Sequence, residues 1–208
     1  LTYEVEKNNI KIYKGHTVTN TSGYKRINKV TIMQLSKDGQ KVVGSKINLS
    51  CDCLGVSGGW TPAVHLFTQS GGKLKFRDED QVFIPYSYPS EQLSIGSCNG
   101  DFTLDEILTN VPKSLKEFLK IKNTEYDNLE VLSGTNKLKR NIWLLPSDKI
   151  LGKTKSFVDY QNDATAKDIK LALREGFRSI EHVKRYTTTG MGTDQGKLGN
   201  MHALGIIS

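Results

Sequence analysis

The stretch TAKDIKLALREGFRSIEHVKRYTTTG, residues 165–190, carries the clearest structural signals in this sequence. Thr165 and Asp168 have the spacing of a helix N-terminal cap. Apolar residues then recur at helical spacing as far as Gly176, a residue type that favours the left-handed C-terminal cap. A second helix is expected to start at Ser179 and to end at Gly190. The sequence therefore predicts a helical hairpin whose inward side chains are Ile169, Ala172, Leu173, Ile180, Val183 and Tyr186.

Residues 8–49 instead alternate apolar and polar side chains with the period of two that is typical of half-buried strands. The Asp38-Gly39 pair is a hairpin-turn signal between two of these segments. We therefore predict a three-stranded antiparallel meander. Its strands are expected at residues 10–13, 30–35 and 42–47.

The chain is then expected to form a strand over residues 47–57 that ends at the turn Gly58-Gly59-Trp60. An open α/β sheet usually presents its ligand crevice where a buried strand runs into such a turn. One further short strand is expected at residues 81–84. These features predict an α/β part followed by a smaller α-helical part.

The Gly-rich turn at residues 96–100 precedes a predicted helix. Thr103 and Glu106 have capping-box spacing at its start. The unpaired amides of a first helical turn favour anion binding, and a plain strand-to-helix turn is the alternative. Pro112 is expected to end this helix, with a second short helix over residues 113–121.

Residues 122–154 are rich in Lys, Asn, Asp, Ser and Gly, and such a stretch is longer than most loops within a domain. We interpret it as a linker. The predicted division is therefore 1–121, 122–154 and 155–208.

The chain has 208 residues, with 29 Lys and Arg against 22 Asp and Glu, and an apolar fraction of 37%. Its longest apolar runs are far shorter than the roughly 20 residues of a membrane-spanning helix. The positive charge shows no long basic block, which favours a solvated surface over a nucleic-acid site. Because the chain starts at Leu1 with a charged segment, we interpret it as a fragment of a longer protein.

The three cysteines, Cys51, Cys53 and Cys98, lack the paired spacing of a zinc site, so no metal site is expected. An odd number of thiols favours a reducing, cytoplasmic location. The sequence contains no catalytic triad, carboxylate pair or phosphate-loop motif. We therefore assign no catalytic residue.

Two strings are more specific than these patterns, and together they resemble the alpha subunit of heterotetrameric sarcosine oxidase over most of the chain. The first is CDCLGVSGGWTPAVHL, residues 51–66. The second is FVDYQNDATAKDI, residues 157–169, continued by EGFRSIEHVKRYTTTGM at 175–191 and DQGK at 194–197.

The resemblance implies a domain for each part of the chain. Residues 1–121 correspond to the second half of an NAD-binding, disulfide-reductase-like oxidoreductase domain. Residues 155–208 correspond to a small helical domain like bacterioferritin-associated ferredoxin. The family's dinucleotide loop and its tetrahydrofolate domain are not in this sequence, so NAD is expected to be shared with an upstream half.

The resemblance also implies cofactor contacts. The turn before the capped helix is similar to the loop that closes over the dinucleotide, although Asn99-Gly100-Asp101 replaces the usual Gly-Asp ending. The implied NAD residues are Gly58, Gly59, Trp60, Gly96, Ser97, Asn99, Gly100, Phe102, Thr103 and Leu104.

A second implied site is the loop from Thr187 to Lys197, which in the family lies toward the FMN at the interface between the alpha and beta subunits. Thr188, Thr189 and Lys197, with Tyr186, offer hydroxyls and a cation to a flavin or its phosphate. A plain connecting loop is the alternative. Relatives bind an iron–sulfur cluster through cysteines in this region, and this sequence has no cysteine after Cys98.

The implied function is a share in the oxidative demethylation of sarcosine to glycine, with hydrogen peroxide as a product and the one-carbon unit passed to tetrahydrofolate. This chain is expected to bind NAD and to dock the flavin-bearing beta subunit, with the enzyme's small subunits as further partners. Neither nucleic acid nor a membrane is expected as a partner. The alternatives are a non-catalytic assembly module, or a subunit of a related proline- or opine-type amine dehydrogenase complex.

Overall fold

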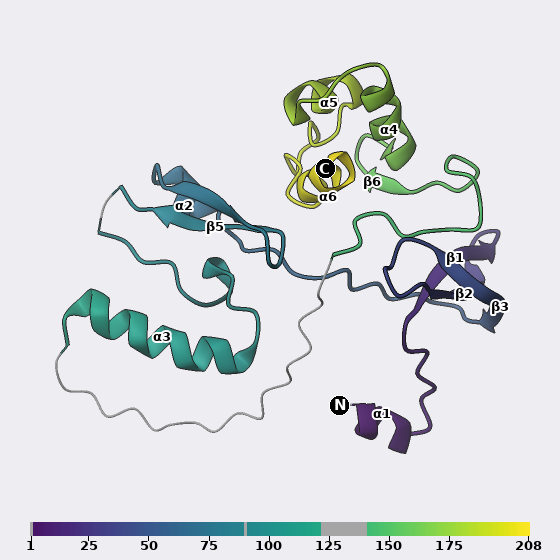
Figure 1. Cartoon of the computed structure of the whole chain (residues 1–208), viewed down its shortest axis with the longest axis horizontal. Helices are drawn as coiled ribbons and strands as arrows, with labels where there is room; N and C mark the ends of the chain where they lie inside the picture. The colour runs from purple at the N-terminus through teal and green to yellow at the C-terminus, as the bar shows by residue number, and fades with distance from the viewer. Residues whose placement is uncertain (1, 90, 122–140) are drawn as a thin grey trace. The chain divides into compact units, whose positions relative to one another are not determined.

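The computed structural model describes residues 2–89, 91–121 and 141–208, which Figure 1 draws in colour from the N-terminus to the C-terminus. The chain divides into two compact units. The first combines Leu1–Gly55 with Ile142–Ser208, and the second is Val56–Asn141. This grouping differs from the predicted division at residues 121 and 155, which remains a prediction. Most of the predicted linker, residues 122–140, lies outside the described residues.

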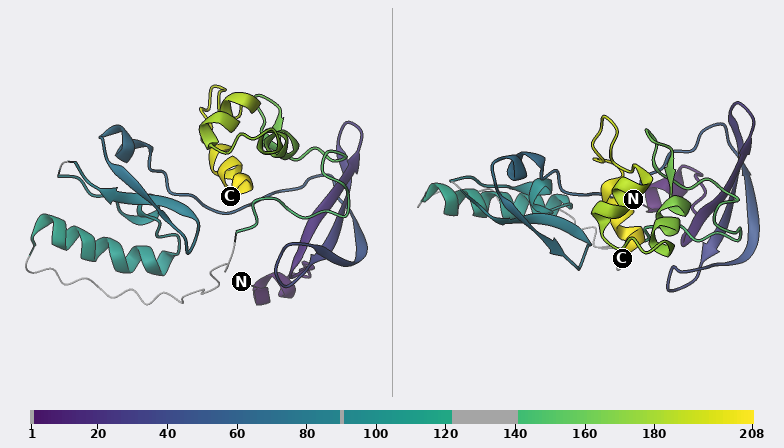
Figure 2. Two further views of the ribbon diagram at one scale, coloured as in Figure 1. Left: turned by 45° about the horizontal axis from the view of Figure 1, so that its top comes forward. Right: turned by 90° about the horizontal axis from the view of Figure 1, so that it is seen from above.

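The first unit begins with a short helix and a sheet. Helix α1 spans Thr2–Lys7, and strands β1 (His16–Gly23), β2 (Ile27–Leu35) and β3 (Val42–Ser50) pair antiparallel in the order β1-β2-β3. The predicted meander is confirmed, and Figure 2 shows it as a twisted three-stranded ribbon. Gly39 has the positive φ, +69°, expected for the turn before β3.

The middle strand holds this sheet together. Residues 30–33 of β2 are all buried, and Ile32 stands opposite both Val18 on β1 and Ile47 on β3. The Thr31 hydroxyl donates to the Asn48 side-chain oxygen at 2.9 Å across the β2–β3 pair. Burial along β2 and this cross-strand hydrogen bond both favour the observed register.

Two predicted strand limits are wrong. Residues 10–13 form no strand, and pairing with β2 begins only at His16. Asn9 and Gly15, with positive φ values of +57° and +68°, interrupt the extended chain on either side of this segment. Strand β3 ends at Ser50 rather than at residue 57, and it is an edge strand with mostly exposed side chains. The Gly58-Gly59 turn therefore does not follow the carboxyl end of a buried strand.

The C-terminal part of the first unit contains a small hairpin and helices. Strands β6 (Phe157–Asp159) and β7 (Ala164–Thr165) pair antiparallel, and helices α4 (Ala166–Arg174), α5 (Ile180–Thr187) and α6 (Asn200–Ile207) follow. Helix α4 packs against both α5 and α6, so the arrangement extends beyond a two-helix hairpin.

The predicted capping box of α4 is confirmed. The Thr165 hydroxyl accepts from the Asp168 amide at 3.4 Å, and the Asp168 carboxylate accepts from the Thr165 amide at 2.9 Å. Gly176 follows the helix with a φ of +98°. These features fix where α4 starts and ends.

The helical core is built from small and β-branched side chains. Its buried members are Val158, Ala166, Ile169, Ala172, Val183 and Ala203. Tyr186, predicted to point inward, is 46% exposed. Leu144 and Leu151, from the predicted linker, pack against this core, and an added Cβ on Gly205 would meet Trp143 at 2.1 Å. These described residues of the predicted linker thus pack against the helical core.

The second unit consists of short elements. Helix α2 (His65–Gln69) precedes the antiparallel strands β4 (Lys73–Arg77) and β5 (Val82–Ser87), and a 3₁₀ turn η1 (Gly96–Asn99) leads to helix α3 (Leu104–Leu119). The predicted strand at 81–84 corresponds to β5. Phe67 on α2 is buried, and its ring lies 5.0 Å from that of Tyr88.

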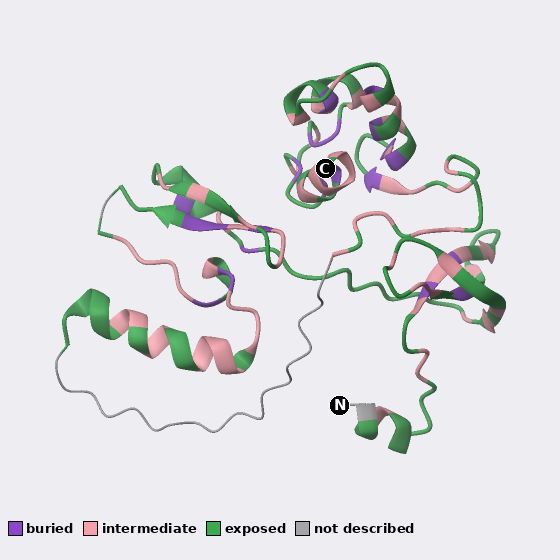
Figure 3. Cartoon of the chain, viewed as in Figure 1, coloured by how far each residue is buried: buried purple, intermediate pink, exposed green. Residues whose placement is uncertain are grey.

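Helix α3 runs through Pro112, so the prediction that this residue ends the helix is wrong. A proline inside a helix costs about 3 kcal/mol because it removes one hydrogen bond. The capping box and the continuous apolar spacing on both sides of Pro112 outweigh this local cost. None of the α3 residues is buried, as Figure 3 shows.

The sheets that the structure describes are all antiparallel. The predicted α/β class holds as a mixture of helices and strands, without a parallel sheet among residues 2–89, 91–121 and 141–208. Every helix among the described residues is too short or too polar to span a bilayer.

We predict that Ile169→Ala lowers the free energy of unfolding by about 2–5 kcal/mol, because Ile169 is fully buried and its truncation leaves a cavity. Denaturant unfolding followed by circular dichroism measures the change. Leu198→Ala, at a side chain that is 79% exposed, is the control and should change the free energy by less than about 0.5 kcal/mol. Equal losses in both variants would contradict this assignment of the core.

Candidate functional site

The turn predicted to hold NAD is fixed by an arginine from the neighbouring β-hairpin. Arg77 donates from its guanidinium to the Gly100 carbonyl at 2.8 Å and from Nε to the Asp80 carboxylate at 2.8 Å. The hydrogen bond to Asp80 raises the pKa of Arg77 further, so the guanidinium stays charged. Gly100 has a φ of +84°, and an added Cβ would lie 2.6 Å from Arg77. Both the positive φ and the close approach of Arg77 favour glycine at this position.

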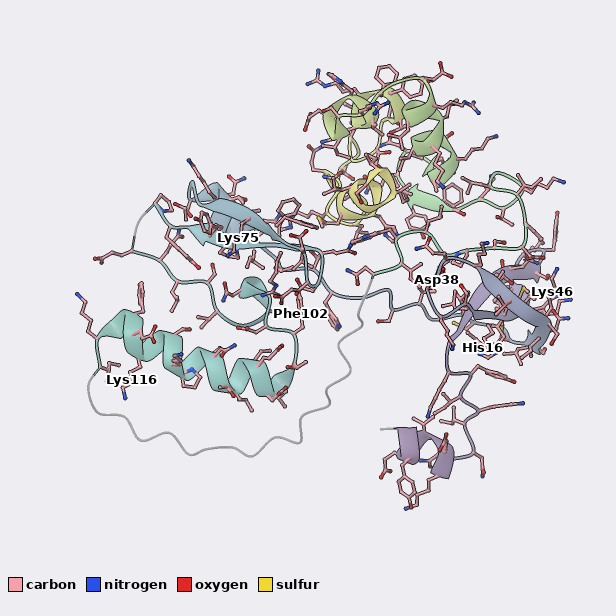
Figure 4. All side chains as sticks on the ribbon, in the orientation of Figure 1. His16, Asp38, Lys46, Lys75, Phe102 and Lys116 are labelled. Carbon is pink, nitrogen blue, oxygen red and sulfur yellow. The ribbon has the colours of Figure 1, made fainter. Side chains whose placement is uncertain are left out.

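The start of α3 is already capped by its own side chains. Glu106 accepts from the amides of Phe102 at 3.3 Å and Thr103 at 3.2 Å, and its own amide donates to the Thr103 hydroxyl at 3.4 Å. Phe102 lies directly before the helix in Figure 4. Two of the amides predicted to face a pyrophosphate are therefore used inside the capping box.

Acidic side chains outnumber the one basic group, Arg77, around this turn. Asp105 and Glu106 lie in the first turn of α3, and Asp101 accepts from the Asn110 side chain at 3.0 Å. Carboxylates are favourable at a helix N-terminus, where they compete with any bound anion. A pyrophosphate at this position would have to overcome their repulsion.

The other residues predicted for NAD are mostly accessible. Gly58, Gly59 and Trp60 lie in exposed coil, with Trp60 79% exposed. Ser97 and Leu104 are exposed, Asn99 is half-buried, and Gly96 is buried. Gly96 has a φ of +64°, and nothing lies within 4 Å of the Cβ position that it lacks. Open space at this position is compatible with a close approach by a ligand.

The loop predicted to face a flavin is braced by the β6–β7 turn. The Asp159 carboxylate accepts from the Gly190 amide at 2.7 Å, and the Asn162 side chain donates to the Thr188 carbonyl at 3.1 Å. The Gln161 side-chain oxygen accepts from the Thr193 hydroxyl at 3.1 Å and the Asp194 amide at 3.2 Å. Three neighbouring residues of one turn thus hold the loop along its length.

The flavin candidates on this loop differ in accessibility. Thr188 and Lys197 are exposed, whereas Thr189 is 2% exposed. The Thr189 hydroxyl lies 2.7 Å from that of Thr187, which donates to the Val183 carbonyl at 2.8 Å. Through this buried hydroxyl contact with Thr187, Thr189 connects the loop to the end of α5.

Sequence reasoning missed Asp159, Gln161 and Asn162, although all three stand in the string that carries the family resemblance. Asp159 is 5% exposed. Burial acts to raise its pKa, but hydrogen bonds from the Gly190, Asn162 and Gln161 amides outweigh burial and lower the pKa below the usual range. An aspartate that ends a short strand before an Asn-Asp turn was the available signal.

A second feature that the sequence did not indicate is a hollow of about 190 Å³ at the start of α4. Lys155, Lys167 and Asp168 give it a mixed charge. The remaining lining residues are Leu151, Gly152, Thr154, Ser156 and Thr165. Among the residues that the structure describes, no group of three or more His, Cys, Asp or Glu side chains could hold a metal ion.

Comparison with known proteins gives one family match and several relatives. Residues 153–208 match the sarcosine oxidase A3 domain. The chain is 31% identical over 201 residues to sarcosine oxidase subunit alpha of Corynebacterium sp. (strain P-1). This match covers 92% of this chain and 20% of that protein. The same subunit of Corynebacterium sp. (strain U-96) is 30% identical over 96% of this chain and 21% of its own length.

A third relative, sarcosine oxidase subunit alpha of Rhizobium meliloti (strain 1021), is 31% identical over 79% of this chain and 17% of its own length. The chain thus spans about a fifth of these curated relatives. The crystal structure of L-proline dehydrogenase from P. horikoshii is similar with a TM-score of 0.53 and 16% identity, covering 100% of this chain and 41% of that one. At this identity the likeness concerns the fold.

We predict that Asp159 makes stability depend on pH. Because its pKa is lower in the folded than in the unfolded chain, its contribution is complete above the ordinary carboxyl pKa and is lost as pH falls through the folded-state pKa. The difference in unfolding free energy between the wild type and Asp159→Asn should therefore shrink on acidification. Denaturant unfolding over a pH series measures it. Asp163→Asn, at an exposed aspartate of the same turn, is the control for removing one carboxylate, and an equal trend in that variant would contradict the role assigned to Asp159.

Proposed function

We propose that this chain is part of an amine-oxidising oxidoreductase. It is related to sarcosine oxidase alpha subunits over most of its length, and residues 153–208 match the sarcosine oxidase A3 domain. In this proposal it docks a flavin-bearing beta subunit and presents Thr188 and Lys197 to FMN. The observation that carries the proposal is the braced loop from Thr187 to Lys197, whose exposed residues Thr188 and Lys197 offer a hydroxyl and a cation.

The geometry of this loop favours binding over a plain connection. A loop whose backbone is already fixed by hydrogen bonds to the β6–β7 turn loses little conformational freedom when a partner covers it. The entropic cost of association is therefore smaller. Met191 on this loop and Leu198 directly after it are 49% and 79% exposed and provide apolar contact area for a subunit. Lys197 can donate a charge-assisted hydrogen bond to a phosphate.

FMN would supply two-electron oxidation chemistry when bound. The part of this chain is to bind and orient: Lys197 compensates phosphate charge, and the Thr188 hydroxyl is a short-range hydrogen-bonding group. That hydroxyl donates to the Thr187 carbonyl, which leaves its lone pairs free to accept. No residue is assigned to proton transfer or to tetrahydrofolate.

NAD contact at Gly96–Leu104 is a second, weaker part of the proposal. The open space at Gly96 supports it, and the capped, acidic start of α3 works against it. Calorimetric titration of the chain with NAD tests this part directly. A heat of binding that Gly96→Ala weakens is expected, with some loss of thermal stability because alanine is strained at the positive φ of Gly96. The absence of any heat of binding to the wild-type chain would remove NAD from the proposal.

Sarcosine is the proposed substrate of the whole enzyme. The sequence is 30–31% identical to sarcosine oxidase alpha subunits and 16% identical to L-proline dehydrogenase, so sarcosine is favoured over proline. Turnover of the assembled enzyme with each amine distinguishes them. A non-catalytic assembly module remains the alternative, and it predicts partner binding without any effect of this chain on the flavin.

We predict that Lys197→Ala weakens FMN retention by about tenfold or more, because it removes one charge-assisted hydrogen bond. The chain is co-expressed with a flavin-bearing sarcosine oxidase beta subunit, and bound flavin is measured by its visible absorbance after gel filtration. Lys170→Ala, at an exposed lysine of α4, is the matched control. Equal flavin retention in the wild type and Lys197→Ala would contradict the proposed FMN contact and favour the assembly module.

A further inference from the structure

Thr188 stands in a backbone conformation that its residue type avoids. Its φ is +58° and its ψ is +12°, in the left-handed region, at the C-terminal cap of α5. A β-branched residue in this region is an outlier that costs on the order of 1–2 kcal/mol. Glycine or asparagine usually occupies such a position. Surrounding contacts must therefore hold Thr188 in place.

The contacts on both sides of Thr188 come from one turn. Asn162 donates its side-chain amide to the Thr188 carbonyl at 3.1 Å, and the Gly190 amide donates to the Asp159 carboxylate at 2.7 Å. The peptide units on either side of the buried Thr189 are thereby fixed. Such strain persists when the surroundings over-determine it, and it clusters at binding sites.

Asp159 is itself held firmly. Its carboxylate accepts from the Gln161 amide at 2.8 Å and the Asn162 amide at 3.1 Å, besides the Gly190 amide. Within the described residues, the recorded partners of this carboxylate are all neutral N–H groups. Since Asp159 is 5% exposed, its negative charge is stabilised by these oriented donors.

Three glycines in or next to the loop lie in close contact with neighbouring groups. An added Cβ on Gly192 would lie 2.2 Å from the Gln161 side-chain oxygen, and one on Gly196 would lie 2.0 Å from the Asn200 oxygen. Gly199 approaches the Val158 carbonyl, where an added Cβ would lie at 2.8 Å. The loop is thus packed directly onto the strand that ends at Asp159.

We propose that Asp159 is a positioning residue: its carboxylate joins the β6–β7 turn to the Gly190 amide and so presents Thr188 and Lys197 in the geometry that FMN binding needs. This inference rests on the proposed function and adds the group that makes the loop a preformed site. Asp159 contacts no cofactor, and its effect is transmitted through Gly190 and Asn162.

The experiment compares Asp159→Asn with Asp163→Asn in the chain co-expressed with the beta subunit. Asparagine is nearly isosteric but loses the charge and one acceptor oxygen. Asp159→Asn should raise amide hydrogen exchange at Gly190 by about tenfold or more and lower FMN retention, while exchange in the α4 core stays unchanged. Asp163, exposed on the same turn, should give wild-type values for both readouts.

Lys197→Ala separates the two proposals, because it removes the FMN contact without touching the brace. If Lys197→Ala lowers FMN retention while Asp159→Asn leaves retention or Gly190 exchange unchanged, the positioning role is overturned and the proposed function stands. If neither variant changes retention, the proposed function fails and the inference fails with it. Should Asp159→Asn not fold, Asn162→Ala is measured by the same readouts, since it removes the support of the Thr188 carbonyl. Unchanged FMN retention in that variant would equally overturn the inference, because Asn162 is one of the two residues through which Asp159 is proposed to act.

Discussion

The hydrogen bond from the Gly190 amide to the Asp159 carboxylate is the contact on which the C-terminal part of this protein depends. It joins segments 31 residues apart in sequence and satisfies a buried charge with backbone donors. Around it, Gln161 and Asn162 attach to the same loop. A loop rich in glycine, which composition alone would describe as flexible, is consequently held along most of its length.

The two predicted cofactor surfaces differ in how many polar groups remain available to a ligand. At the start of α3 the chain satisfies its own amides with Glu106 and adds acidic neighbours. On the loop after α5, internal contacts hold the backbone, and Thr188 and Lys197 remain accessible. The second surface therefore has groups available for a ligand, whereas the first is largely self-satisfied. This difference is the reason that our proposal places most weight on the flavin.

Local signals predicted local structure well. The sequence predicted four local features: both capping boxes, the Asp38-Gly39 turn and the glycine after α4. Each of them depends on residues that are close in sequence. Helix α3 was misread at Pro112, where the amphipathic pattern outweighs the local penalty. The brace at Asp159 was missed because its partner lies far along the chain, and one sequence does not reveal which amide a carboxylate meets. The family resemblance located the loop without indicating what holds it.

Strand β3 is one of the two edge strands of the meander, and an edge strand can pair with another molecule in concentrated solution. Strand β3 leaves backbone groups on its outer side that could template the strand of another molecule. Gly44, with a φ of +75°, and the register shift between Ile32 and Gln34 interrupt its regularity, and Lys46 adds a charge that pairs with Asp148. Natural sheets use such irregularities and lysines to discourage intermolecular β-association. The β3 edge of the meander thus carries features that disfavour strand pairing with another molecule.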